Sequence, residues 1–365
     1  MNLAITKTRH KEYLLILPII SLIILFFNQS PTSLSLSIII NIMSLIAILA
    51  SAFSVVRHAD VLAHRFGEPY GSLILSLSVV ILEVGLISAL MATGESEPQL
   101  MRDTLYSIIM IVMTGLVGFS LLLGGYKFAT QYVNLNGIKQ YLIAIIPLAV
   151  LTLVFPSSVQ NTEISITQLS IVLACISALT YFVFLIIQTK THKQLFVYEY
   201  EDDSDDGDPS HGKPSSHSNL HHAIWLVIHL AAVISITKMN ANNLDYLLTT
   251  VNAPKQFTGF LIALLILSPE GLGAIKAVLL NQVQRAMNIF FGSILATISL
   301  TVPAVVTISI ITNNEIVFGL DLPQIIILTT TLVLCHISFS SGKTNILNGA
   351  SLLTIFIGYI LTIIY

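Results

Sequence analysis

Charged residues are scarce in this chain. Asp, Glu, Lys and Arg make up 10% of its 365 residues, whereas soluble domains average about 25%. So few charges cannot cover a water-facing surface, which excludes an ordinary soluble protein. The net charge is −3, and no basic stripe with interleaved aromatic residues is present. A nucleic-acid partner is therefore excluded as well.

Cysteine is nearly absent, and enzyme motifs are missing. The two cysteines, Cys175 and Cys335, both lie inside apolar runs, which excludes a disulfide framework or a CxxC metal site. No HExxH motif and no nucleophile–base pair is present, so we expect neither an enzyme nor a bound cofactor. Transported ions would be substrates.

Long apolar runs are abundant instead. Apolar residues form 55% of the chain and occur in runs of about 18–25, enough to cross the bilayer as helices. The alternating pattern of a membrane β-barrel is absent. The sequence predicts an all-α polytopic membrane protein, with the lipid bilayer as its partner and about eleven spans. These are expected at 12–28, 35–56, 70–93, 104–125, 139–156, 166–188, 222–238, 256–280, 287–311, 324–341 and 345–364.

The distribution of Lys and Arg predicts the orientation. With the N-terminus in the cytoplasm, only Arg102, Lys238 and Lys255 fall on the outer side, and Lys276 lies within a span. The remaining basic residues lie on the cytoplasmic side, as the positive-inside rule requires. We therefore expect a bacterial inner-membrane protein with a periplasmic C-terminus. Arg102 and Arg285 are expected to anchor helix ends, and the alternative is that they contact the ion site.

One polar segment divides the chain. We expect an N-terminal segment with the first helix at 1–34, a five-helix repeat at 35–188, a linker at 189–221 and a second five-helix repeat at 222–365. The linker is acidic and then rich in histidine, which is typical of a solvated tether. Its dense carboxylates also suit a regulatory cation-sensing loop, and both interpretations stay open. The acidic residues are Glu199, Glu201, Asp202, Asp203, Asp205, Asp206 and Asp208.

The two repeats carry weakly similar segments. A glutamate is followed in each by an arginine that precedes a threonine by twelve residues, as in Arg102 to Thr114 and Arg285 to Thr297. An odd number of spans per repeat turns the second repeat upside down relative to the first. Inverted repeats with a site at mid-membrane are a common plan of secondary transporters.

Two glutamates, Glu83 and Glu270, are the main functional candidates. Each lies near the middle of its expected span, where an ionised carboxylate is costly and marks a functional site by default. A purely structural carboxylate, bonded to a neighbouring helix, is the alternative. A carboxylate binds a metal cation only when deprotonated, so proton and cation compete for the same oxygens. Such competition couples their fluxes.

Several hydroxyl groups are candidates for auxiliary ligands. Pro269 lacks an amide donor and is expected to open the helix beside Glu270, freeing carbonyls for a cation. Each hydroxyl alone is more often bonded to the carbonyl four residues earlier. The candidates are Ser78, Ser268, Ser293, Thr114 and Thr297.

Histidines within or beside the spans allow two interpretations. His229 and His336 could carry protons, but a lone membrane histidine more often bonds a neighbouring helix. His58, Asp60 and His64 precede the third span at its cytoplasmic side. They mark either a water-filled vestibule or an ordinary solvated boundary.

The glutamate-bearing segments resemble the alpha-repeats of the calcium/cation antiporter superfamily, particularly its cation/proton exchanger branch. The matching segments are Leu62–Gly71 with Ile81–Ile87, Ser268–Ile275 with Phe291–Pro303, and Ser341–Gly349. The resemblance implies one helix plus two inverted repeats, with Glu83 and Glu270 as the paired carriers. The asparagine of the branch's Gly-Asn-Ala-x-Glu signature is missing here, which leaves room for monovalent ions.

The expected function is proton-coupled antiport, with small inorganic cations as partners. The resemblance implies efflux of Ca2+, Na+ or K+ driven by proton influx. The alternative is a cation channel or passive permease regulated by the acidic loop, which would not couple cation flux to protons.

Overall fold

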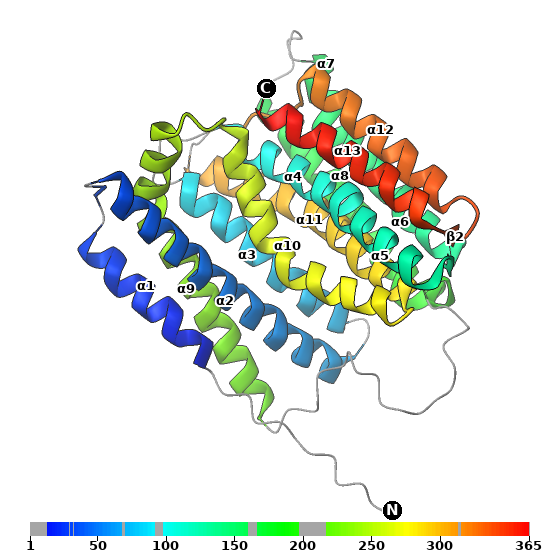
Figure 1. Ribbon diagram of the computed structural model, residues 1–365, viewed down its shortest axis with the longest axis horizontal. Coiled ribbons are helices and arrows are strands. Elements are labelled where there is room, and N and C mark those ends of the chain that lie inside the picture. Colours follow the sequence, from blue (N-terminus) through cyan, green and yellow to red (C-terminus); the bar gives the residue numbers. More distant parts are fainter. Residues whose placement is uncertain are drawn as a thin grey trace, which may run out of the picture. The chain divides into compact units, whose positions relative to one another are not determined.

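The structure is a computed structural model that describes residues 13–28, 30–31, 33–67, 70–91, 98–159, 166–196, 217–312 and 315–364. Ten helices within these ranges are long and apolar enough to cross a membrane, and a shorter apolar helix covers Tyr13–Phe27. The prediction of an all-α polytopic membrane protein is therefore confirmed (Figure 1). The seven acidic residues predicted to form a regulatory loop lie outside the described residues.

The helices form two compact units, each of which draws on both halves of the sequence. The four parts predicted from the sequence, 1–34, 35–188, 189–221 and 222–365, do not coincide with these two units. That division stays a prediction. The helices of the first unit are η1 (Tyr13–Leu15), α1 (Ile16–Phe27), α2 (Leu34–Phe66), α3 (Tyr70–Met91) and α9 (Asn219–Thr250).

Helices α2 and α9 of the first unit pack along their length in antiparallel directions, with α1 beside them (Figure 1). A chain of amides joins the three helices. Asn240 donates to Asn41 at 2.8 Å, Asn41 to the Asn243 carbonyl at 3.0 Å, and Asn243 to the Asn28 carbonyl at 2.9 Å. Apolar surface gives no driving force between helices in lipid, so such bonds and close packing hold membrane helices together.

The second unit contains the other described helices and one short sheet. Its first part comprises α4 (Leu100–Met110), η2 (Ile111–Leu116), α5 (Val117–Phe128), β1 (Gln131–Tyr132), α6 (Leu135–Ala149), η3 (Val150–Val154), α7 (Phe155–Val159), α8 (Ile166–Ile186), η4 (Ile187–Thr191) and η5 (Lys193–Phe196). Its second part comprises α10 (Gln256–Leu279), α11 (Val283–Thr312), α12 (Leu322–Phe339), β2 (Lys343–Thr344) and α13 (Ile346–Ile364).

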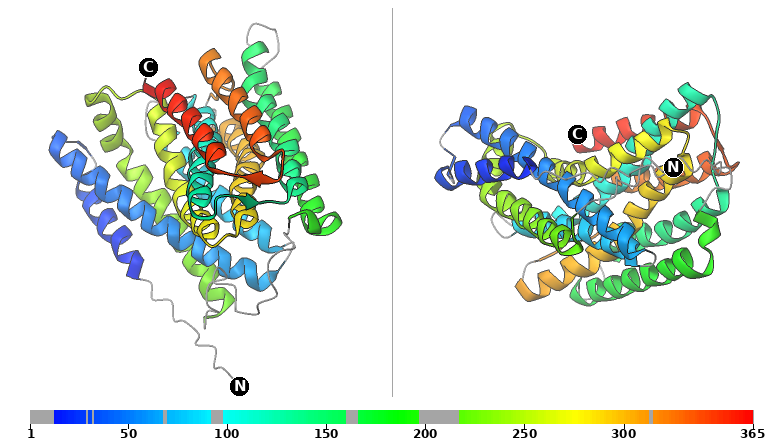
Figure 2. Two further views of the ribbon diagram at one scale, coloured as in Figure 1. Left: turned by 45° about the vertical axis from the view of Figure 1, so that its right-hand side comes forward. Right: turned by 90° about the horizontal axis from the view of Figure 1, so that it is seen from below.

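Helix α13 packs against α5 and α12 within the second unit. Figure 2 shows α13 in red beside α12 in orange. The strands β1 and β2 pair antiparallel, with Gln131 opposite Thr344. This pairing ties the segment after α5 to the segment before α13, so one end of the contact between these two helices is fixed in register.

Three π-helical segments interrupt the long helices of the second unit. They are η2, η3 and η4. A π-helical segment inserts an extra residue into a helical turn and is frequent at functional sites. Segment η2 continues α4 into α5, so Leu100–Phe128 forms one span with a π-helical centre. These segments were not predicted from the sequence.

Candidate functional site

Glu270 lies on α10, which packs against α4, η2 and α11 within the second unit. The residue as a whole is partly exposed, but its Oε2 atom is buried. Ser293 on α11 interacts with the carboxylate. The contact is looser than a regular hydrogen bond, so neither Oε2 nor the Ser293 hydroxyl has a regular hydrogen-bond partner among the described residues. Glu270 therefore presents one buried carboxylate oxygen that no described residue satisfies, on a membrane-spanning helix.

Two further predicted hydroxyl groups lie on elements that pack against α10. Thr297 lies one turn beyond Ser293 on α11 and is 2% exposed, so it shares a face with Ser293. Thr114 lies in η2, which packs against both α10 and α11. A β carbon added at Gly271 would meet the Leu116 side chain at 3.0 Å. The η2 segment therefore lies directly against the turn that carries Glu270.

Two of the predicted hydroxyl ligands in this unit bond their own helix. Thr114 donates to the Met110 carbonyl and Ser268 to the Leu264 carbonyl. The prediction that Pro269 opens the helix is wrong, because α10 runs without a break from Gln256 to Leu279. A proline removes one amide donor from the helical ladder, and this single loss is not enough to unwind α10.

Glu83 lies on α3 in the first unit and is fully buried. Ser78 precedes it by five residues and donates to the Ile74 carbonyl at 2.7 Å. Gly85 faces α9, since a β carbon there would lie 2.7 Å from the Ile234 side chain. Successive helical residues turn by about 100°, so Glu83 projects about 200° away from this contact. A ligand role for Ser78, as for the other hydroxyls, stays a prediction.

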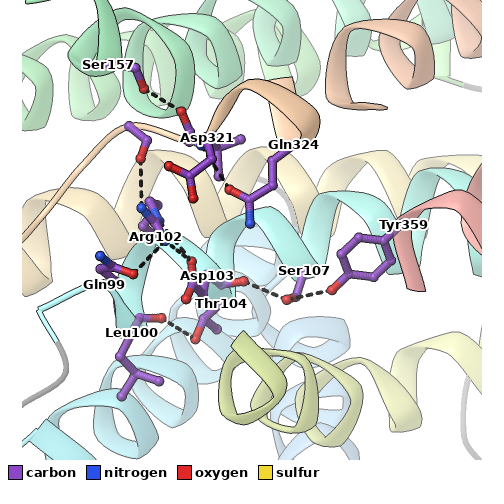
Figure 3. A network of polar contacts seen from close by, with 12 residues as sticks. Gln99, Leu100, Arg102, Asp103, Thr104, Ser107, Ser157, Asp321, Gln324 and Tyr359 are labelled. Carbon is purple, nitrogen blue, oxygen red and sulfur yellow. Dashed lines mark hydrogen bonds and ion pairs between the residues drawn. The ribbon is translucent and has the colours of Figure 1, made fainter. Parts of the chain in front are cut away.

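A buried ion pair lies at the start of α4 in the second unit (Figure 3). Arg102 and Asp103 are 3% and 5% exposed, and Arg102 Nη2 lies 2.8 Å from Asp103 Oδ1. Arg102 also donates to the Gly319 carbonyl at 3.0 Å and to Gln99 Oε1 at 2.9 Å. The expectation that Arg102 anchors a helix end is confirmed. The burial of this pair was not evident from the sequence, because the Gly319 carbonyl that accepts from Arg102 lies 217 residues away in the chain.

The same network continues into α13 and the start of α12. Ser107 donates to the Asp103 carbonyl at 2.6 Å and accepts from Tyr359 at 2.8 Å. Asp321 caps α12 through a capping box with Gln324 (Figure 3). These bonds satisfy the buried polar groups of the network. We therefore assign the network a structural role at the end of the unit.

Among the residues that the structure describes, no group of three His, Cys, Asp or Glu side chains converges to hold a metal ion. Neither glutamate therefore belongs to a preformed cluster of charged ligands within these ranges. The chemistry of Glu270 is that of one carboxylate with neutral oxygens near it. A site with few charged ligands generally holds a hard cation less tightly than one with many.

Long apolar helices that carry buried carboxylates are typical of polytopic transporters of small ions. The sequence model of the sodium/calcium exchanger protein family matches two segments of the chain, residues 36–190 and 221–365. The chain therefore belongs to this family.

Comparison with known proteins agrees with this assignment. The chain is 68% identical to the sodium-potassium/proton antiporter ChaA of Escherichia coli (strain K12), over 98% of this chain and 97% of that protein. Among solved structures, native YfkE has a TM-score of 0.73 at 17% identity and covers 96% of this chain and 99% of its own. The H+/Ca2+ exchanger CAX has a TM-score of 0.65 at 13% identity, covering 95% and 86%. Both solved structures share the fold of this chain. The prediction of a transporter rather than an enzyme is confirmed.

Proposed function

We propose that this protein is a proton-coupled cation antiporter that exports cytoplasmic Na+, K+ or Ca2+ in exchange for H+. The Glu270 carboxylate carries the proposal, because its Oε2 atom is buried on a membrane-spanning helix without a regular hydrogen-bond partner among the described residues. Glu83, fully buried on α3, is its proposed counterpart. The sodium-potassium/proton antiporter at 68% identity supports this class of substrate.

Exchange follows from competition at the carboxylates. A deprotonated carboxylate binds the cation with help from nearby hydroxyl oxygens, and a protonated one releases it. If only the cation-loaded or the protonated site reorients between the two sides, each cation leaving the cytoplasm is exchanged for protons. The two matches to the family model support the inverted-repeat plan on which such alternating access depends.

The proposed orientation places the N-terminus and the acidic linker in the cytoplasm and the C-terminus in the periplasm of a bacterial inner membrane. The distribution of Lys and Arg supports it. Arg57 and Arg65 near the end of α2 and Lys190 in η4 then lie on the cytoplasmic side.

Proteoliposomes with an acidic interior and a pH-sensitive dye test the proposal. External Na+, K+ or Ca2+ is added in turn, and isotope uptake is followed together with internal pH. We expect uptake of at least one cation to raise the internal pH, and the most effective ion identifies the substrate. Cation uptake without proton movement would instead indicate a channel or passive permease. Absence of both would contradict transport of these ions.

Ser293 is expected to support cation binding, because its hydroxyl lies beside the Glu270 carboxylate. Ser293→Ala should raise the cation concentration for half-maximal exchange about tenfold, the scale of a hydrogen bond to a charged group. The maximal rate should change less. Thr307→Ala is the control, since Thr307 is exposed on the same helix and bonds the Pro303 carbonyl at 2.7 Å. Equal concentration dependence in both variants would exclude Ser293 from the site.

A further inference from the structure

Four buried oxygen atoms of the first unit have no regular hydrogen-bond partner among the described residues. They are Asn240 Oδ1, Asn243 Oδ1 and Thr237 Oγ1 on α9 and Ser37 Oγ on α2. Their residues are between 0% and 7% exposed. Ser37, Asn240 and Asn243 all contact Asn41 on α2, and Thr237 adjoins Asn240 on the surface of α9, three residues before it. We call these five residues the amide junction.

The hydrogen bonds of Asn41 fix the direction of the Asn240 amide. Asn41 Nδ2 lies 2.8 Å from the Ser37 carbonyl oxygen and 3.0 Å from the Asn243 carbonyl oxygen. Carbonyl oxygens only accept, so the nitrogen of Asn41 must face them and its Oδ1 must face Asn240. The Asn240 atom that lies 2.8 Å from this oxygen is therefore Nδ2. Turning the Asn240 amide around would place two oxygens against each other.

Helix α1 fixes the direction of the Asn243 amide in the same way. Asn243 Nδ2 donates at 2.9 Å to the carbonyl of Asn28, the residue that caps the end of α1. Asn28 donates its own Nδ2 to the Ile24 carbonyl at 2.9 Å. Each side-chain nitrogen of these amides therefore already donates to an oxygen. No rotation of an amide can supply a donor to the Oδ1 atoms of Asn240 and Asn243.

The two hydroxyl groups of the junction do not make the bond that is usual in helices. A serine or threonine within a helix often donates to the carbonyl four residues earlier, as Ser78 and Thr104 do here at 2.7 Å. Ser37 and Thr237 have no such bond in the part of the chain that the structure describes. Buried polar groups in folded proteins are generally paired. Four oxygens in one junction therefore indicate a bound ligand that is positively charged or donates hydrogen bonds.

The chemistry of the junction suits a monovalent cation. Neutral carbonyl and hydroxyl oxygens are ligands for hard cations and can replace their hydration shell. Helix α1 and the part of α2 before Arg57 contain no charged residue, and the nearest charged residues along α9, Lys238 and Asp245, are exposed. No carboxylate on these three helices balances a second positive charge at the junction, which favours Na+ or K+ over Ca2+.

The depth of the junction limits the cost of holding a charge there. The apolar run of α9 was expected to end at 238, so Asn240 and Asn243 lie beyond it, near the edge of the hydrocarbon layer. In the proposed orientation this edge is on the periplasmic side. The junction also lies away from α3, because Ile234 contacts Gly85 on α3 and Asn243, nine residues later, projects about 180° from it.

We propose that the amide junction is a binding site for a monovalent alkali cation, Na+ or K+, which holds α1 against α2 and α9. The four oxygens without regular partners are its ligands, and Asn41 orients two of the residues that carry them. The three helices pack against one another (Figure 1). The site goes beyond the antiport proposed above, because neither Glu83 nor Glu270 belongs to it.

Thermal unfolding in detergent tests this site without any transport. The background protein is Glu83→Gln/Glu270→Gln, which lacks the proposed carrier carboxylates, and NaCl or KCl is compared with choline chloride at equal ionic strength. We expect Na+ or K+ to raise the thermal midpoint saturably, by about 3–6 °C at about ten times the half-saturating concentration. No rise above choline would overturn the proposal and leave a buried water as the occupant.

The double variant Ser37→Ala/Thr237→Val in the same background assigns the rise to the junction. It removes two oxygens that bond no other described residue, so the midpoint in choline should not fall. The half-saturating cation concentration should increase at least about tenfold, since even groups that only support a metal ligand contribute this much to affinity. An unchanged half-saturating concentration would overturn the site, whatever the midpoint in choline.

Thr249→Val is the matched control on α9. Thr249 is exposed and donates to the Asp245 carbonyl at 2.8 Å, so its loss should leave the half-saturating concentration at the background value. If the background protein is not produced, the three proteins are compared with both glutamates present, because cation binding at the glutamates is then common to all three and cancels. An equal cation dependence of the double variant and the control would again overturn the site. The result stands whether or not the protein exchanges cations for protons, because no step of the measurement involves transport.

Discussion

Replacing either glutamate with glutamine is expected to reduce exchange to the level of empty liposomes. Glu270→Gln and Glu83→Gln preserve the size of the side chain but remove the group that takes up and releases a proton. Loss of a group that only supports a metal ligand already costs about 10–100-fold, so loss of the ligand should exceed about a hundredfold. The measurement is isotope uptake together with internal pH in proteoliposomes.

Two comparisons make this prediction specific to the buried carboxylates. Glu315→Gln removes an exposed carboxylate outside the helices and should exchange like wild type. Glu270→Asp keeps the carboxylate but shortens the side chain by one methylene. This variant should therefore retain measurable exchange with a weaker cation affinity. If either glutamine variant folds and still exchanges at more than about a tenth of the wild-type rate, that glutamate is not an obligatory carrier.

The number and positions of the helices were predictable because the bilayer sets their length. Each expected apolar run corresponds to a helix of the structure. The ends of two helices were not predictable in this way. Helix α2 was expected to end at 56 and continues to Phe66, and α9 was expected to end at 238 and continues to Thr250. Their added turns carry polar residues, such as His58 and Asn240, that bond across the pair. A search for apolar runs stops at these residues, although their partners make them stable within the helix pair.

The candidate site was only partly predictable. Isolated acidic residues inside apolar runs can be recognised from the sequence alone. Glu83 and Glu270 are both on membrane-spanning helices. The π-helical form of η2, which packs against α10 and α11, was not predicted from the sequence. The effect of Pro269 was overestimated, since the lost amide bond is one among many in α10.

The contact between His58 on α2 and His222 on α9 illustrates a different limit. His58 lies before the acidic linker and His222 lies after it. Only the antiparallel register of α2 and α9 brings His58 opposite His222. The sequence could indicate that histidines are frequent around the linker, but their mutual distances follow from the pairing of two helices.

Gly349→Ala is expected to destabilise the second unit strongly. Gly349 lies where α13 approaches α5 closely, so an added β carbon would clash with the Leu122 amide nitrogen and lie 2.6 Å from the Gly118 carbonyl oxygen. Both are backbone atoms, so no side-chain movement can relieve the clash and the helices must separate. Overpacking of this kind costs about 1–3 kcal/mol. We expect the thermal midpoint in detergent to fall by about 2–6 °C.

Gly358→Ala on the same helix is the matched control. Its added β carbon would meet only the end of the Ile327 side chain, at 3.4 Å. Exchange of glycine for alanine in an open helix position stabilises by about 0.5–1 kcal/mol, so the two variants should change stability in opposite directions. The comparison separates close packing from helix propensity, because both changes are chemically identical and lie on one helix. If Gly349→Ala were as stable as Gly358→Ala, the close packing of α13 on α5 would not be what holds this part of the second unit together, and the short sheet β1–β2 would have to fix α13 instead.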